Sequence, residues 1–412
     1  MRIVYLHQYF NTPAMPGGVR SYDIANHLVR NGHSVHMVTT VRDKSKRNSW
    51  RYSNEDGIHT HWLDLPYSNS FNFLRRLKAF LLFAFFSAKK GASIDCDIVY
   101  ATSTPLTIAI PALYISWRKS VPLVFEVRDL WPEVPIAIGV LKNPILKYLA
   151  RNLEKFVYKK STSIIALSEG MKKGVIDVCR EKDKVFNVPN FSNLELFHSK
   201  NSTEIIPEIR NLLSKPSPLL VYTGTFGVIN NVPYLVDIAK QLITLNSDVE
   251  ILIIGDGKEL EHIKKYAKEM KVLDVNFFIA PSIAKKDLPQ VLAAADLASN
   301  IVIDIPEVWN NSANKFFDAL AAGVPLLINS GGWQADLIKS ENAGLVTHRL
   351  TIKESAIRID AFMHDKNLLK RSSLNAAKLS KKFFNKKKLV RQIEKILILS
   401  LEKYNASHEN SE

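Results

Sequence analysis

Cysteine is scarce in this sequence of 412 residues, which contains only Cys96 and Cys179. The two cysteines lack the spacing of a metal site or a redox pair, so a reducing cytoplasm is the simplest environment for the chain. Long apolar runs are also missing, since Ala79–Ala88 has about half of the roughly 20 residues that span a bilayer. The short apolar run Met1–Leu6 is expected to form a first strand and not a signal peptide.

Recognisable cofactor motifs are lacking as well. The G-x-G-x-x-G fingerprint of a dinucleotide site is absent. Residues 95–97 have the D-x-D form of a metal motif, but they directly precede an expected strand. The pairs His33/His36 and His59/His61 have ligand-like spacing without a third ligand. We therefore expect no metal and no other cofactor.

Positive charge, in contrast, is abundant and lies mostly in the first half of the chain. Residues 1–190 contain 27 Lys and Arg against 15 Asp and Glu, a net charge of +12, whereas the remaining residues contain 28 against 25, a net charge of +3. A basic half favours anionic partners such as nucleic acid, phosphates or an acidic membrane surface. A merely soluble basic surface is the alternative.

The segment Arg75–Lys90 distinguishes among these partners. Its Phe-rich run lies between cationic ends, and such a helix can lie in the interface of an anionic membrane. The run is too aromatic for a typical nucleic-acid-binding surface. The sequence shows no other cluster of aromatic and basic residues of the kind that recognises nucleic acid. We therefore expect no nucleic-acid partner and a peripheral contact with an anionic membrane surface. A helix buried in the first domain is the alternative.

Strand-like apolar runs alternate with helical stretches, which is typical of parallel α/β sheets. The expected strands are 3–6, 34–39, 98–101, 123–127 and 163–166, followed by 219–223, 250–254, 275–279, 297–301 and 326–328. We predict two Rossmann-like, doubly wound domains, residues 1–193 and 194–384, that face a central cleft at the carboxyl ends of their strands. Residues 385–404 have the apolar spacing of a helix, and a polar, disordered tail is expected from 405 to 412.

The stretch Ser312-Ala-Asn-Lys-Phe-Phe-Asp-Ala-Leu-Ala-Ala-Gly-Val-Pro325 is the most informative about function. On a helix, Asn314, Lys315 and Asp318 share one face. A helix that opens with Ser312, Asn314 and Lys315 can hold an anion, because its free N–H groups, its dipole and the lysine all favour negative charge. Asp318 can accept hydrogen bonds from two sugar hydroxyls. The set suits a nucleotide-sugar diphosphate, and an ordinary capped amphipathic helix is the alternative.

Three glycine-containing loops follow expected strands. Gly17 and Gly18 lie in a long loop that runs through Arg20 into a helix, so backbone N–H groups can approach a ligand there. A plain βα turn would look the same. In the second half, Gly224-Thr225 and Gly255-Asp256 each follow a strand and could bring the backbone toward a nucleotide.

Arg128 and Asp129 come directly after the strand at 123–127. Charged side chains at the carboxyl end of an apolar strand are more often functional than structural. An Arg–Asp pair that fixes the following proline turn is the alternative.

The stretch at 310–325 resembles the donor-binding element of GT-B glycosyltransferases of family 4. That family usually has a glutamate, seven residues, a second glutamate and then Ala-x-Ala-x-Gly-x-Pro, where this chain has Asn310 and Asp318 at the two acidic positions. The Ser-x-Asn-Lys variant, together with Asp129-Leu-Trp-Pro132, resembles the WbuB-like branch. This branch contains aminosugar transferases of bacterial O-antigen and capsule synthesis, among them a fucosaminyltransferase. The resemblance extends from the first Gly-Gly loop to Gly331-Gly332.

The resemblance implies a GT-B fold whose final helix crosses back to the first domain. It implies transfer of an N-acetyl aminosugar, with retention of configuration and without a metal, from a nucleotide-linked donor that is most often UDP-linked. The acceptor would be a polyprenyl-diphosphate-linked saccharide on the cytoplasmic face of the inner membrane. A UDP-N-acetylglucosamine 2-epimerase shares this fold and is the alternative, although its Glu/His arrangement is absent.

The resemblance also assigns roles to single residues. Lys315 and the adjacent helix N-terminus would bind the diphosphate, Asp318 the ribose and Asn310 the transferred sugar. Asp129 and Arg128, which stands where many relatives have histidine, would orient the sugar or the acceptor. Relatives often carry Arg and Lys after the first strand of the second domain, whereas residues 228–232 here are Val-Ile-Asn-Asn-Val. Lys315 would therefore have to neutralise more of the diphosphate charge.

Overall fold

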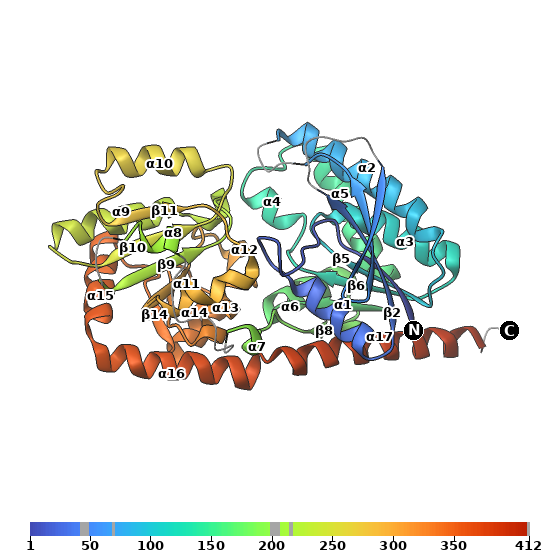
Figure 1. Ribbon diagram of the computed structural model, residues 1–412. Coiled ribbons are helices and arrows are strands. Elements are labelled where there is room, and N and C mark those ends of the chain that lie inside the picture. Colours follow the sequence, from blue (N-terminus) through green and yellow to red (C-terminus); the bar gives the residue numbers. More distant parts are fainter. Residues whose placement is uncertain (42–48, 68–70, 198–206, 214–216, 410–412) are drawn as a thin grey trace.

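The computed structural model describes residues 1–41, 49–67, 71–197, 207–213 and 217–409. It shows two α/β domains side by side, with the last two helices running beneath both (Figure 1). The prediction of two domains with mostly parallel sheets is confirmed. No helix in the described part of the chain is long and apolar enough to cross a membrane.

The first domain is built on a sheet of order β3-β4-β2-β1-β5-β6-β7-β8. Its strands are β1 (Arg2–Leu6), β2 (Ser34–Val41), β3 (Trp50–Glu55), β4 (Ile58–Asp64), β5 (Ile98–Thr102), β6 (Leu123–Val127), β7 (Ser163–Ala166) and β8 (Val185–Asn187). Its helices are α1 (Arg20–Arg30), α2 (Phe73–Ala92), α3 (Ala109–Lys119), α4 (Glu133–Ala137), α5 (Pro144–Lys160) and α6 (Glu169–Cys179). All strand pairs are parallel except β3 with β4.

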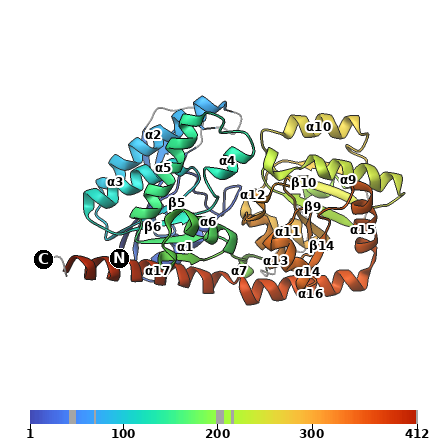
Figure 2. The same ribbon diagram turned by 180° about the vertical axis from the view of Figure 1, so that it is seen from behind.

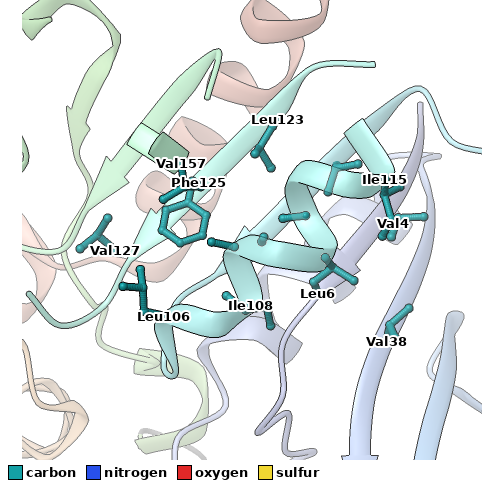
Figure 3. Close-up of a cluster of buried hydrophobic side chains, with 14 of the residues drawn as sticks. Val4, Leu6, Val38, Leu106, Ile108, Ile115, Leu123, Phe125, Val127 and Val157 are labelled. Atoms are coloured by element: carbon teal, nitrogen blue, oxygen red, sulfur yellow. The ribbon is translucent and has the colours of Figure 1, made fainter. Parts of the chain in front are cut away.

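The core of the first domain lies between the sheet and the helices on its faces. Strands β5 and β6 are buried along their whole length, as expected for parallel strands covered on both sides. Figure 3 shows the cluster formed by Val4, Leu6 and Phe125 of the sheet with Ile115 of α3 and Val157 of α5. This packing fixes the carboxyl ends of β1, β5 and β6, where the first-domain candidate residues lie.

The second domain contains a sheet of order β11-β10-β9-β12-β13-β14, in which every pair is parallel. Its strands are β9 (Leu219–Thr223), β10 (Glu250–Ile254), β11 (Phe277–Ala280), β12 (Leu297–Asn300), β13 (Leu326–Ile328) and β14 (Gly344–Val346). Its helices are α7 (Leu194–Phe197), α8 (Pro207–Arg210), α9 (Pro233–Thr244), α10 (Leu260–Glu269), α11 (Leu288–Ala293), α12 (Pro306–Trp309), α13 (Asn314–Ala322), α14 (Trp333–Ser340), α15 (Ile352–His364) and α16 (Lys366–Phe383).

The final helix α17 (Lys386–Glu409) returns to the first domain. Its Leu389, Ile393 and Leu397 are buried in one cluster with Ile24 and Leu28 of α1. The predicted helix therefore exists and crosses back, as Figures 1 and 2 show. The expectation of a disordered tail from residue 405 is wrong for residues 405–409, which continue the helix, and residues 410–412 lie outside the described residues.

Candidate functional site

Helix α13 begins in the most informative stretch of the sequence. Its buried face, which includes Phe316, Phe317 and Leu320, anchors the helix in the domain core. The helix ends at Gly323, whose φ of 70° is the left-handed conformation that glycine adopts readily. At its start, Ala313 supplies no side-chain cap. The first N–H groups of the helix therefore have no capping side chain and can accept an anionic ligand.

The amino group of Lys315 lies among neutral groups. Its Nζ donates hydrogen bonds to Tyr222 Oη at 3.0 Å and to Asn230 Oδ1 at 3.1 Å. It also lies 4.1 Å from the centre of the Tyr222 ring. Within the described residues, no carboxylate forms an ion pair with it. Burial lowers the pKa of Lys315 to about 7. Lys315 Nζ is thus a buried amine whose described hydrogen-bond partners are neutral.

The loops after β9 and β10 close around this amine. A Cβ added to Gly224, which has a φ of 146°, would lie 3.7 Å from Lys315 Nζ, and one added to Gly255 would lie 1.9 Å from the Gly224 carbonyl oxygen. Thr225 holds the Tyr222 hydroxyl in position, because its carbonyl accepts a hydrogen bond from Tyr222 Oη at 2.8 Å. Asp256 is exposed, and its carboxylate accepts a hydrogen bond from the backbone N–H of the next residue. Gly224 thus lies beside the amine, Thr225 and Gly255 contact its neighbours Tyr222 and Gly224, and the Asp256 side chain caps a local turn.

The Gly17–Gly18 loop of the first domain reaches the start of α13. A Cβ on Gly18 would lie 2.0 Å from Asn314 Nδ2, so the backbone of this loop lies directly against the Asn314 side chain. Gly17 has a φ of 108°, which also favours glycine. The backbone N–H of Lys285 donates to the carbonyl of Met15 in the same loop at 3.2 Å. The structure therefore brings the two domains together at Asn314.

Asn310 and Ser312 also contact the first domain. Ser168 Oγ donates a hydrogen bond to the Asn310 carbonyl at 2.8 Å. The Asn310 side chain lies against Gly170, where an added Cβ would be 1.8 Å from Asn310 Oδ1. The Ser312 carbonyl accepts a hydrogen bond from the Asn190 side chain. Both predicted ligand residues are thus parts of the interface between the domains.

Asp318 has a partner that the sequence did not suggest. Its carboxylate pairs with Lys285 Nζ at 2.5 Å, and both side chains are buried. Burial raises the pKa of Asp318, and Lys285 acts in the opposite direction. Asn314, Lys315 and Asp318 have different partners in this structure: Asn314 lies against Gly18, Lys315 is hydrogen-bonded to Tyr222 and Asn230, and Asp318 is paired with Lys285.

Arg20 is a correction to the predicted donor-binding set. Its Nε and Nη2 donate to Glu126 Oε2 at 3.1 and 2.9 Å, and its Nη1 donates to the Pro189 carbonyl at 2.8 Å. Arg20 is 2% exposed and Glu126 is fully buried. The guanidinium neutralises a carboxylate inside the first domain and is not available to a phosphate. The loop position of Arg20 gave no indication of this inward orientation.

Arg128 and Asp129 lie where three strands end. Asp129 accepts a hydrogen bond from Thr104 Oγ1 at 2.9 Å, while Arg128 Nη1 lies 3.3 Å from Nε2 of His7. Among the described contacts there is no ion pair between Arg128 and Asp129. This argues against the alternative that the two residues pair with each other to stabilise the following proline turn. Sequence reasoning missed His7 as a site residue, although a polar side chain directly after the apolar β1 was the available signal.

The two facing parallel-sheet domains define the GT-B class of fold, and solved structures agree. Sucrose-phosphate synthase from Thermosynechococcus elongatus matches with a TM-score of 0.74 and 15% identity, over 96% of this chain and 98% of that chain. HepE from Anabaena, solved with UDP and glucose, matches with a TM-score of 0.70 and 17% identity, over 96% and 98%. WaaG, a glycosyltransferase involved in lipopolysaccharide biosynthesis, matches with a TM-score of 0.68 and 15% identity, over 96% and 99%.

Two family models then identify the family. Residues 17–190 match the glycosyl transferase 4-like domain, and residues 205–379 match the glycosyl transferases group 1. The chain belongs to the glycosyltransferases of the GT-B fold. No curated protein matches it significantly. The predicted fold and enzyme class are confirmed, and the assignment to the WbuB-like branch stays a prediction.

Proposed function

We propose that the protein transfers an N-acetyl aminosugar from a UDP-linked donor to a polyprenyl-diphosphate-linked saccharide in O-antigen or capsule synthesis. The observation that carries the donor assignment is Lys315, a partly buried amine at the uncapped start of α13 that has no carboxylate partner among the described residues. HepE, which shares the fold, was solved with UDP and glucose. The choice of the WbuB-like branch rests on the Ser-x-Asn-Lys variant of the sequence, and the acceptor class follows from that branch.

The proposed chemistry is stabilisation of charge without a metal and with retention of configuration. Lys315 and the N–H groups of α13 would stabilise the negative charge that develops on the leaving diphosphate. Asn310 would contact the transferred sugar, and Arg128 and Asp129 would orient the sugar or the acceptor from the first domain. The Asp318 carboxylate would contact the ribose only after Lys285 moves, since the two are paired. The backbone at Gly224 lies beside the Lys315 amine, so a donor bound to that amine would lie close to the backbone there.

The acceptor is a lipid, and we propose that the face formed by α2, α3 and α5 docks on an anionic membrane. The three helices lie along the outer side of the first domain (Figure 2), and α3 contacts both of the others. They carry five, two and five Lys or Arg residues, and their only acid, Glu154, is buried. Exposed apolar side chains accompany these cations: Leu74, Leu81, Phe85, Ile110, Tyr114, Trp117, Ile145, Tyr148, Leu149 and Phe156.

A panel of nucleotide sugars tests the donor assignment. Thermal shift and slow donor hydrolysis are measured with UDP-, GDP- and dTDP-linked sugars on the full-length protein. We expect UDP-linked N-acetyl aminosugars to raise the Tm and to be hydrolysed. Stabilisation by another nucleotide alone would replace the UDP assignment. The absence of any response to every donor would contradict the proposed function.

A further inference from the structure

The Lys315 amine lies among neutral groups from several elements. Tyr222 comes from β9, and burial raises the pKa of its hydroxyl, so it stays uncharged. Asn230 ends the short helix after β9 and offers only an amide. On α13 itself, the carboxylate of Asp318 is paired with Lys285. Asp256, on the loop after β10, is exposed and caps its own turn. From the first domain, the uncharged Gly18 lies against the neighbouring Asn314.

In such surroundings the protonated and the neutral forms of the amine have similar free energies near pH 7. Removing the ammonium from water disfavours the charged form, and no carboxylate offsets this cost. Hydrogen bonding to Tyr222 and Asn230 holds the amine in place but provides no counter-charge. Burial accordingly lowers the pKa of Lys315 to about 7. A diphosphate in contact with Nζ would supply the missing negative charge and raise the pKa again.

We propose that Lys315, positioned by Tyr222 and Asn230, binds the donor diphosphate as an ammonium ion and takes up a proton from solvent when the donor binds. This inference rests on the proposed function of the same site. Above pH 7 the free protein holds the neutral amine, and the complex holds the ammonium. Donor affinity must then fall as the pH rises above 7, approaching tenfold for each pH unit, because each complex formed binds one additional proton.

Calorimetry measures this proton directly. UDP-N-acetylglucosamine is titrated into the full-length protein at pH 8.0 in two buffers of different ionisation enthalpy, and UDP serves as a second probe. The diphosphate diester of the sugar nucleotide does not titrate in this range. We expect uptake of close to one proton by the wild type, and an affinity that falls severalfold to tenfold between pH 7.5 and 8.5.

Two variants separate the inference from a general pH effect. Lys315→Arg carries a charge that does not titrate, so its binding should take up no proton and be nearly independent of pH. Asn230→Asp places a carboxylate beside the amine, keeps it protonated in the free protein, and should also abolish uptake while weakening binding. The Tm of each variant reports whether it folds. Binding by the wild type without proton uptake, or uptake that persists in Lys315→Arg, would overturn the inference. No binding of either probe would instead count against the proposed function.

Discussion

At the scale of the residue, Lys315 is the group whose removal should affect activity most specifically. Lys315→Ala removes a charge-assisted contact with the donor, worth about 1.5–3 kcal/mol, so kcat/KM should fall about 10- to 150-fold. The Tm should stay the same or rise, since a poorly solvated amine is removed. Lys339→Ala, at an exposed position on α14, is the matched control. An unchanged kcat/KM at unchanged Tm would exclude the diphosphate role.

Arg20 should matter for stability and not for donor contact. Arg20→Ala leaves the buried Glu126 carboxylate without its cation, which costs about 3–5 kcal/mol. Urea unfolding of the variant and the wild type measures this loss. A variant of normal stability with impaired UDP affinity would instead restore Arg20 to the donor-binding set.

Asp318→Asn distinguishes the two roles of this carboxylate. The substitution removes the counter-charge of the buried Lys285. The free energy of unfolding should therefore fall by about 3–5 kcal/mol. The ribose role predicts weaker UDP binding as well, because two hydroxyls need an acceptor. Calorimetry with UDP, at a temperature where the variant is folded, separates the effects. Equal UDP affinities would leave Asp318 with the ion pair alone.

The sequence identified the residue types at the site better than their partners. Lys315, Gly224 and Gly18 could be found because a loop at the carboxyl end of a parallel strand has a known place in the fold. The pairing of Arg20 with Glu126 and of Asp318 with Lys285 joins residues far apart in the chain, and no local pattern reports such contacts. These long-range pairs decide whether a charged side chain is available to a ligand.

At the scale of the element, the docking face can be tested by its exposed side chains. Part of the Phe-rich run between Arg75 and Lys90 is not available to lipid, because Phe83 is 1% exposed and belongs to the core of the first domain. Phe85 and Trp117 are 54% and 74% exposed. The double variant Phe85→Ser/Trp117→Ser should stay folded, bind UDP normally and lose co-sedimentation with acidic liposomes.

Salt and two controls complete this experiment. High salt should release part of the wild type, since each well-placed cation contributes about 1 kcal/mol. Val275→Ser, at an exposed apolar position in the second domain, should leave liposome binding unchanged, whereas Phe83→Ser should destabilise the fold. If the wild type never co-sediments with acidic liposomes, the lipid acceptor must reach the enzyme over another surface.

The elements themselves were predictable where burial is complete. Strands β5, β6 and β10 are mostly apolar and are buried along their whole length, because helices cover both faces of the sheet. The β3–β4 hairpin was missed because β3 lies at the edge of the sheet, where a partly exposed strand needs no apolar run. Strands β8 and β14 were missed because they are short and only partly buried, whereas the equally short β13 is apolar and fully buried.

At the scale of the whole molecule, activity should not depend on a metal. Among the described residues no group of three or more His, Cys, Asp or Glu side chains is arranged to hold a metal ion, and residues 95–97 form the segment directly before β5. Incubation with EDTA should leave the initial rate of transfer largely unchanged. Loss of activity that Mg²⁺ or Mn²⁺ restores would contradict this expectation.

The return of α17 to the first domain has a consequence for biosynthesis. Ile24 and Leu28 of α1 find their covering side chains, Ile393 and Leu397, only after the entire second domain has been translated. A nascent chain that has left the ribosome up to residue 193 therefore exposes an apolar strip that the finished enzyme hides. Chaperones have a binding target there for as long as translation continues. A gene fragment that encodes the first domain alone should yield an aggregation-prone product, and supplying residues 385–409 as a separate peptide should improve its solubility.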